Sequence, residues 1–273
     1  MPLLDDLNAL AKQVRKHSKL KPKVAILLGT GLGGVAGKIK AEARIPYGEI
    51  VGMPVSTAES HKGEIVLGTL AGVPVVAFSG RLHCYEGYSA ADVVVPVRLA
   101  KVLGAQVLIM GSAVGGLNPH YEIGDLAVLD DHINLMGVNP LVGPNDDRVG
   151  GRWPDMFSTY DPKLIALADQ VAIAQGRHLH RAVYVGVMGP NLETRAEYRM
   201  LRTLGGDVVG MSTVPEAVAA VHCGMRTLAF AIITDRCLPD ALEPADVSKI
   251  IAAAKGAEPV LTGLITALLP KIA

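Results

Sequence analysis

Residues 80–87 read GRLHCYEG, a short glycine-bounded segment whose side chains could bind an anion. In an extended segment, side chains two positions apart face the same way, so Arg81 and His83 can both reach one ligand. A guanidinium forms paired charge-assisted hydrogen bonds to phosphate oxygens, and an imidazole adds a further donor. The segment therefore predicts an oxyanion site; the alternative is a surface turn in which Arg81 pairs with Glu86.

A second segment, residues 189–198, reads GPNLETRAEY and carries the carboxylate of Glu193 on a connection that begins with Gly-Pro. An ionised carboxylate only accepts hydrogen bonds, so it suits a ligand that presents N–H groups. Together the two segments predict one site with an end for an oxyanion and an end for a base bearing N–H donors.

Residues 29–34 (GTGLGG) match by letter the G-x-G-x-x-G fingerprint of dinucleotide-binding proteins. That fingerprint also needs a second strand ending in Asp or Glu about 20 residues later. Glu49 is near that distance but follows Pro-Tyr-Gly rather than a buried strand. We therefore expect a phosphate cradle of backbone N–H groups, with the Thr30 hydroxyl as an extra donor, or else a plain tight turn.

The elements that must position these segments alternate along the chain. Short apolar runs flanked by Gly, Pro or Asp predict strands covered on both faces: 24–28, 73–78, 107–110, 126–129, 182–187 and 228–233. Helices are predicted at 5–17, 90–103, 162–175, 195–204, 215–223 and 245–269. This alternation predicts an α/β fold with a central mixed β-sheet flanked by helices. In such sheets ligands collect at the carboxyl ends of strands, where the glycine-bounded segments fall.

Composition and charge limit the number of domains and the kinds of partner that this protein can have. The 273 residues are 50% hydrophobic and contain no linker or low-complexity tract, which predicts one domain over residues 1–273. The 26 Lys and Arg balance 26 Asp and Glu without a basic stripe, so we expect no nucleic acid partner. No apolar run reaches about 18 residues, and no signal-peptide pattern opens the chain. We therefore expect no membrane association and a cytoplasmic location; three cysteines without C-x-x-C spacing indicate neither disulfides nor a metal site.

Seven blocks of the sequence resemble, in order, the trimeric purine nucleoside phosphorylases, the family that also contains methylthioadenosine phosphorylase. They are LGTGLGG (28–34), GRLHCYEGY (80–88), AVGGLNP (113–119), DHINL (131–135), NPLVGPND (139–146), GPNLET (189–194) and GMSTVPE (210–216). The resemblance implies a phosphorylase-like fold. It also implies phosphorolysis of purine (deoxy)ribonucleosides to the free base and (deoxy)ribose 1-phosphate, in purine salvage. Inorganic phosphate would be the co-substrate, with no cofactor and no metal.

In that reaction positive charge develops on the sugar and negative charge on the departing purine, so an anion is needed beneath one and donors beside the other. By resemblance, phosphate is bound by Thr30, His61, Arg81, His83, the backbone N–H of Ala113, and Ser212, with His61 closing over it. Tyr85 and Met211 line the ribose. Glu86 orients His83, a role that carboxylates commonly play for imidazoles.

The resemblance assigns the purine to Glu193, between Leu192 and Val209 as apolar walls. Glu193 would accept hydrogen bonds from N1–H and the 2-amino group of a guanine-type base. Adenine has no N1–H, and an unpaired buried polar group is costly, so Glu193 indicates 6-oxopurine nucleosides such as inosine and guanosine.

Two positions depart from the 6-oxopurine pattern. Asp235 stands where 6-oxopurine-specific members have Asn; we hypothesise that burial near Glu193 raises its pKa and that it protonates N7 as the base leaves. Val247 stands near the place of a histidine that contacts the 5'-hydroxyl, and an apolar group there suits a 5'-methylthio substituent. Both changes favour an alternative, a methylthioadenosine or adenosine-accepting phosphorylase.

Trp153 is the single tryptophan. It could pack in the core; by resemblance, an aromatic residue here reaches from a neighbouring subunit to cover the ribose, which implies a homotrimer. A nucleoside-binding protein without chemistry is a further alternative, but it would have little reason to keep the whole phosphate set.

Overall fold

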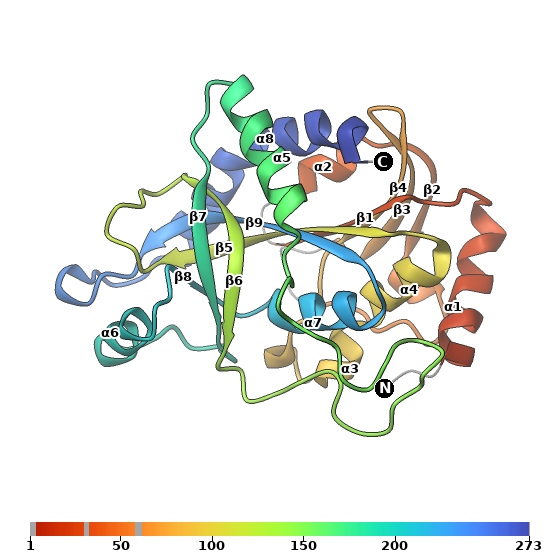
Figure 1. The fold of residues 1–273 in the computed structure, drawn as a ribbon, viewed down its shortest axis with the longest axis horizontal. Helices are drawn as coiled ribbons and strands as arrows, with labels where there is room; N and C mark the ends of the chain where they lie inside the picture. The colour runs from red at the N-terminus through yellow and green to blue at the C-terminus, as the bar shows by residue number, and fades with distance from the viewer. Residues whose placement is uncertain (1–3, 30–32, 58–61, 273) are drawn as a thin grey trace.

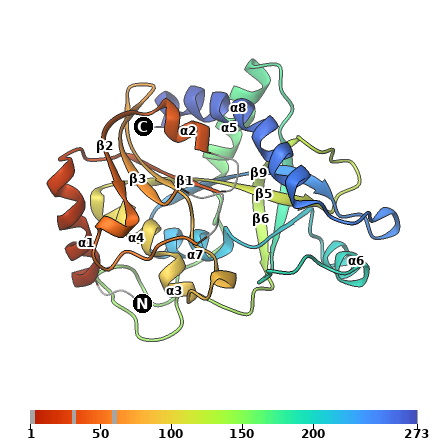
Figure 2. The same ribbon diagram turned by 180° about the vertical axis from the view of Figure 1, so that it is seen from behind.

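The computed structural model describes residues 4–29, 33–57 and 62–272, in which nine strands form one mixed sheet with helices on both faces (Figure 1, Figure 2). The strands are β1 Val24–Leu28, β2 Lys40–Pro46, β3 Glu64–Leu70, β4 Val73–Ser79, β5 Val107–Gly116, β6 Leu126–Asn134, β7 His180–Gly186, β8 Val208–Gly210 and β9 Arg226–Arg236. Their order is β2-β3-β4-β1-β5-β8-β7-β6-β9. The predicted fold class is confirmed.

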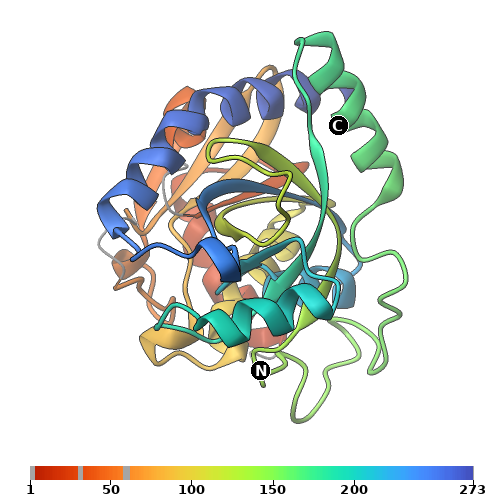
Figure 3. The same ribbon diagram turned by 90° about the vertical axis from the view of Figure 1, so that its left-hand side faces the viewer.

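β5 and β9 also pair directly, so the second half of the sheet closes into a ring. The two strands run parallel from Val107 opposite Arg226 to Gly116 opposite Arg236, and the ring continues through β6, β7 and β8. Figure 3 views the molecule from this side. The register shifts between Val114 and Gly115, an irregularity of the kind that redirects side chains at the end of a strand.

The helices are α1 Leu4–His17, α2 Gly33–Lys38, α3 Ala90–Val93, α4 Val95–Leu103, α5 Pro162–Ala174, α6 Arg195–Thr203, α7 Val214–His222 and α8 Val247–Ile272. Short 3₁₀ turns lie at η1 Tyr47–Glu49, η2 Cys84–Glu86 and η3 Pro239–Ala241. α8, α5 and α2 lie on one face, and α7, α4 and α3 lie on the other (Figure 1). α1 buries Leu7, Leu10, Ala11 and Val14 in one stripe against α4 and β2, because these residues recur at helical spacing.

The six predicted strands and six predicted helical segments are present, the strand 24–28 with its predicted bounds and the others with shifted ends. Segment 90–103 is two helices that meet at the non-helical Val94. Pro96 has no N–H to continue the helical hydrogen bonds, and its ring crowds the carbonyl four residues earlier. Three strands were not predicted: β2 is an edge strand with mostly exposed polar side chains, β8 has three residues, and β3 was overlooked.

α8 is, by length and composition alone, apolar enough to cross a membrane. In the fold it packs against β9, α5 and α2. Its buried side chains are Ala254, Ala257, Leu261, Thr262, Leu264, Ile265, Leu268 and Leu269. Packing on the sheet therefore accounts for its apolar face.

Gly68 in β3 lies where β2 bulges, between Ala41 and Ala43. A Cβ at Gly68 would overlap the Lys40 carbonyl and lie 2.8 Å from the Ala41 Cα, both of which are backbone. We expect Gly68→Ala to lower the free energy of unfolding by about 1–3 kcal/mol, measured by urea denaturation.

Gly263→Ala on α8 is the control, because a Cβ there meets nothing within 4 Å. It should gain about 0.5–1 kcal/mol from helix propensity. Equal stability of Gly68→Ala and the unsubstituted protein would contradict the tight approach of β2.

Candidate active site

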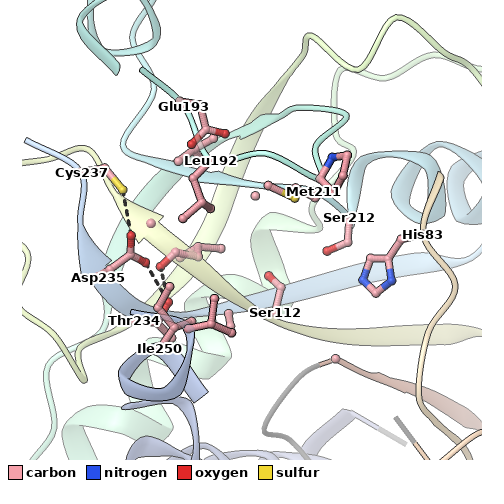
Figure 4. Close-up of a pocket in the computed structure, with 18 of the residues that line it drawn as sticks. His83, Ser112, Leu192, Glu193, Met211, Ser212, Thr234, Asp235, Cys237 and Ile250 are labelled. Atoms are coloured by element: carbon pink, nitrogen blue, oxygen red, sulfur yellow. Dashed lines mark hydrogen bonds between the residues drawn. The ribbon is translucent and has the colours of Figure 1, made fainter. Parts of the chain in front are cut away.

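A cavity of about 400 Å³ opens where β5, β8 and β9 end. Of the residues predicted for the site, those that line it are Arg81, His83, Tyr85, Ala113, Leu192, Glu193, Val209, Met211, Ser212, Asp235 and Val247. In Figure 4, Ser112, Ser212 and His83 lie together on one side, while Thr234, Asp235 and Cys237 lie on the other. The structure thus gathers one set of side chains at each end of a single cavity.

Arg81 follows β4 and is almost fully buried at the first end of the cavity. Its Nη1 donates to Ser212 Oγ at 2.7 Å and to Thr213 Oγ1 at 3.4 Å. Its Nε lies 3.3 Å from Glu216 Oε1. The alternative of a surface turn with an Arg81–Glu86 pair is therefore wrong.

Glu86 instead binds His83, whose Nδ1 lies 2.8 Å from Glu86 Oε1. Because a carboxylate only accepts, it favours a hydrogen on Nδ1 and directs Nε2 away from itself. The N–H and hydroxyl of Thr57 donate to Glu86 Oε2 at 2.6 and 2.7 Å. Burial acts against ionisation, but the hydrogen bonds from Thr57 and His83 lower the pKa of Glu86. The ring of Tyr85 stacks on His83 with centroids 4.6 Å apart.

The carboxyl-terminal part of β5 supplies Ser112 and Ala113 to the same end. The Ser112 hydroxyl is buried and, among the described residues, has no hydrogen-bond partner. An unsatisfied buried hydroxyl is costly, so it suits a ligand oxygen in the cavity. The sequence analysis missed Ser112, although it directly precedes the predicted Ala113.

The glycine segment is described only in part. Gly29 lines the cavity, but the Gly34 N–H donates to Glu258 of α8, so this amide does not belong to a phosphate cradle. Thr30 and His61 lie outside the described residues.

The other end of the cavity carries Glu193 and Asp235. Asp235 Oδ1 lies 3.1 Å from Thr234 Oγ1, and Asp235 Oδ2 lies 3.1 Å from Cys237 Sγ. Burial raises the pKa of Asp235. Burial also raises the pKa of Glu193, and the negative charge of Asp235 raises it further. The pKa of Asp235 is thus raised, as hypothesised, but the cause is burial and not the charge of Glu193.

Trp153 lies outside the cavity and is 87% exposed, with Arg152 Cζ 5.3 Å from its ring centroid. The interpretation that Trp153 packs in the core is therefore wrong.

Two residues behind Arg81 were missed by the sequence analysis. Glu216 on α7 is completely buried and pairs with Arg81. Thr213 has a φ of +64°, and the Val214 N–H donates to the Ser212 carbonyl at 2.7 Å, which makes a tight γ-turn. Such a backbone costs about 1–3 kcal/mol and is typical of functional sites. Both residues belong to the GMSTVPE block, so the resemblance of that block was the sequence signal that could have identified them.

Among the residues that the structure describes, no group of three or more His, Cys, Asp or Glu side chains could hold a metal ion. The chemistry available is that of a guanidinium, an imidazole and hydroxyls at one end and two carboxyls at the other. This arrangement can bind an oxyanion and a heterocyclic base at the same time.

Comparison with known proteins agrees with this arrangement. The model of the phosphorylase superfamily matches residues 23–270. The chain is 46% identical over 231 residues to purine nucleoside phosphorylase 1 of Bacillus subtilis, covering 85% of each chain. It is 41% identical over 275 residues to purine nucleoside phosphorylase of Mus musculus, covering 98% of this chain and 95% of the mouse protein.

A crystal structure of the Schistosoma mansoni purine nucleoside phosphorylase with inosine superposes with a TM-score of 0.94 at 36% identity, over 99% of this chain and 98% of that one. The same score holds for the complex of that enzyme with adenosine, at 37% identity. The chain therefore belongs to the phosphorylase superfamily. Within it, sequence and structure put the chain among the purine nucleoside phosphorylases.

Glu216→Gln tests the buried pair. The amide keeps the shape but leaves the buried Arg81 without its countercharge, so the free energy of unfolding should fall by about 3 kcal/mol without phosphate. Phosphate should recover more stability in the variant than in the unsubstituted protein, because it supplies negative charge near Arg81. Thermal unfolding with and without phosphate measures both.

Glu42→Gln is the control, since Glu42 is exposed and accepts a hydrogen bond from the Ser18 hydroxyl rather than from a cation. Glu42→Gln should change neither the free energy of unfolding without phosphate nor the stabilisation that phosphate provides. If Glu216→Gln shows the same phosphate-induced shift as the unsubstituted protein, Glu216 does not compensate Arg81.

Proposed function

We propose that this enzyme binds inorganic phosphate at the Arg81 end of the cavity and the purine at the Asp235 end, and so carries out phosphorolysis of purine nucleosides. The observation that supports it is convergence: Arg81, His83 and Ser212 meet at one end of a cavity whose other end holds Glu193 and Asp235. Relatives named purine nucleoside phosphorylase, and related structures with inosine and adenosine bound, support the same substrate class.

In the proposed reaction a phosphate oxygen forms a bond to C1' of the sugar while the bond from C1' to N9 of the purine breaks. The electron pair of the broken bond passes to the purine. Arg81 and His83 hold the phosphate with charge-assisted hydrogen bonds, with the N–H of Ala113 and the hydroxyls of Ser112 and Ser212 as further donors. Thr30 and His61 complete this set by family resemblance.

The purine leaves with excess negative charge, which a proton on N7 neutralises. A neutral Asp235 would supply that proton, and an ionised Glu193 would accept from N1–H of a 6-oxopurine. Tyr85 and Met211 would face the ribose, because both line the cavity. This division of roles favours inosine and guanosine.

A second candidate substrate, 5'-methylthioadenosine, is favoured by the start of α8. Val247, Ile250 and Ile251 line the cavity with three apolar side chains. An apolar lining suits a methylthio group better than a hydroxyl.

Two measurements test the proposal. The first is the initial rate on inosine, guanosine, adenosine and methylthioadenosine, with and without phosphate. The second is the pH dependence of inosine turnover by the unsubstituted enzyme and by Asp235→Asn. The neutral form of Asp235 is lost as the pH rises through its raised pKa, so inosine turnover should fall on the alkaline side. Asparagine does not titrate and cannot supply a proton, so the variant should lack this fall and should turn over inosine more slowly than the unsubstituted enzyme below that pKa.

Equal rates with and without phosphate would exclude phosphorolysis. Full inosine turnover by Asp235→Asn at every pH would exclude Asp235 as the proton donor.

We also propose a homotrimer that works in the cytoplasm. The exposed Trp153 and Phe157, on the segment between β6 and α5, are large apolar side chains that a neighbouring subunit could cover.

Light scattering should give three chains per particle. Trp153→Ala should raise KM for nucleoside while Val51→Ala, also exposed, should not; a monomer with full activity would contradict the trimer.

A further inference from the structure

Two buried side chains, Tyr198 and Cys237, lie between the carboxyls of Glu193 and Asp235 and line the same cavity. Cys237 is 1% exposed, and Figure 4 shows its sulfur directed at Asp235. Its N–H donates to the Gly116 carbonyl at 2.8 Å, and a Cβ at Gly115 would overlap its sulfur. Cys237 is therefore held in place against Asp235.

The contacts link the two carboxyls in series. Cys237 Sγ lies 3.1 Å from Asp235 Oδ2. Tyr198 on α6 packs with Cys237 in one buried cluster and lines the cavity together with Glu193, so its hydroxyl can interact with Cys237 on one side and with Glu193 on the other. Burial raises the pKa of both Tyr198 and Cys237, so each remains protonated and can donate one hydrogen while accepting another.

The two classes of purine need opposite protonation of the two carboxyls. A 6-oxopurine presents N1–H and an acceptor edge at O6 and N7, so it suits an ionised Glu193 and a neutral Asp235. A 6-aminopurine presents a bare N1 and a 6-amino donor, so it suits a neutral Glu193 and an ionised Asp235. Each pattern holds one proton on the pair.

We propose that Glu193 and Asp235 share a single proton through Tyr198 and Cys237, and that the direction of this hydrogen-bond chain follows the base, so that the enzyme accepts both 6-oxo- and 6-aminopurine nucleosides. The inference rests on the proposed function, which sets the base against these carboxyls. Tyr198 and Cys237 are positioning residues in this scheme.

The exchange balances atom by atom. When Asp235 becomes ionised, its Oδ2 proton passes to Cys237 Sγ, the Cys237 proton passes to the Tyr198 oxygen, and the Tyr198 proton passes to Glu193. No net charge moves out of the cavity and no co-reactant is consumed. The Thr234 hydroxyl can donate either to the Val114 carbonyl or to an ionised Asp235, because it lies 3.1 Å from both the Val114 oxygen and Asp235 Oδ1.

The other titratable and charged groups on the facing elements lie at the adjoining rim rather than between the carboxyls. They are Arg236 at the end of β9, Glu243 and Asp246 from the segment between β9 and α8, and Lys249 from α8. The two positive and two negative charges at the rim favour neither carboxyl by sign, whereas the negative charge of Glu197 on α6 raises the pKa of Glu193.

The test is the ratio of kcat/KM for inosine to kcat/KM for adenosine in Cys237→Ala and Tyr198→Phe. Cys237→Ala removes a donor that favours ionised Asp235, so the ratio should rise by roughly tenfold, the factor that 1.4 kcal/mol corresponds to. Tyr198→Phe removes a donor that favours ionised Glu193, so the ratio should fall by a similar factor. A loss of packing alone would not give opposite signs.

Three controls accompany these variants. Cys237→Ser keeps a donor and should restore a ratio near that of the unsubstituted enzyme. Cys223→Ala removes a buried thiol at the C-terminal end of α7, outside the cavity lining, and should leave the ratio unchanged. In the unsubstituted enzyme the pH profiles of kcat/KM for the two nucleosides should share the same apparent pKa values, because both reactions use the pair with one proton.

The outcomes separate the inference from the proposed function. If Asp235→Asn and Glu193→Gln leave the ratio unchanged, the proposed base site is wrong. If they change it but Cys237→Ala and Tyr198→Phe shift it in the same direction or not at all, the proton-sharing chain is wrong. Adenosine turnover that stays undetectable in Tyr198→Phe also overturns the inference.

Discussion

The direct pairing of β5 with β9 is the constraint on which the site depends. It closes the second half of the sheet and brings the end of β5, with Ser112 and Ala113, beside the end of β9, with Thr234 and Asp235. β8 pairs with the end of β5 in the same ring, which brings the residues after it, including Ser212, to the cavity. Without this pairing, β8, β7 and β6 would separate β5 from β9, and the two ends of the cavity would lie apart.

Burial of charge distinguishes the two ends. At the first end Arg81 is buried but compensated by Glu216 at 3.3 Å and by hydroxyls, so a positive charge can persist there without water. At the second end Glu193 and Asp235 are partly desolvated, which raises the pKa of each and makes a neutral form accessible. One cavity can therefore combine a permanent anion site with a base site whose protonation is adjustable.

Parts of this site could be predicted because their signal is local. Arg81 and His83 lie two apart in an extended segment, and Glu193 lies in a short connection before a helix, so residue type and spacing sufficed. Cys237 and Tyr198 could not be found in the same way. Nothing near either residue in the sequence distinguishes it from a packed side chain, and their contact joins α6 to the end of β9.

The sequence by itself determined the α/β class, most of the strands and helices, and the residue types suited to an anion and to a base, because these follow from short-range periodicity and from the chemistry of each side chain. Only the tertiary structure decided that Glu216 pairs with Arg81, that Trp153 lies on the surface, and that Asp235 contacts a thiol. Those choices depend on which strand ends meet after the sheet closes, and long-range pairing leaves no local trace in the chain.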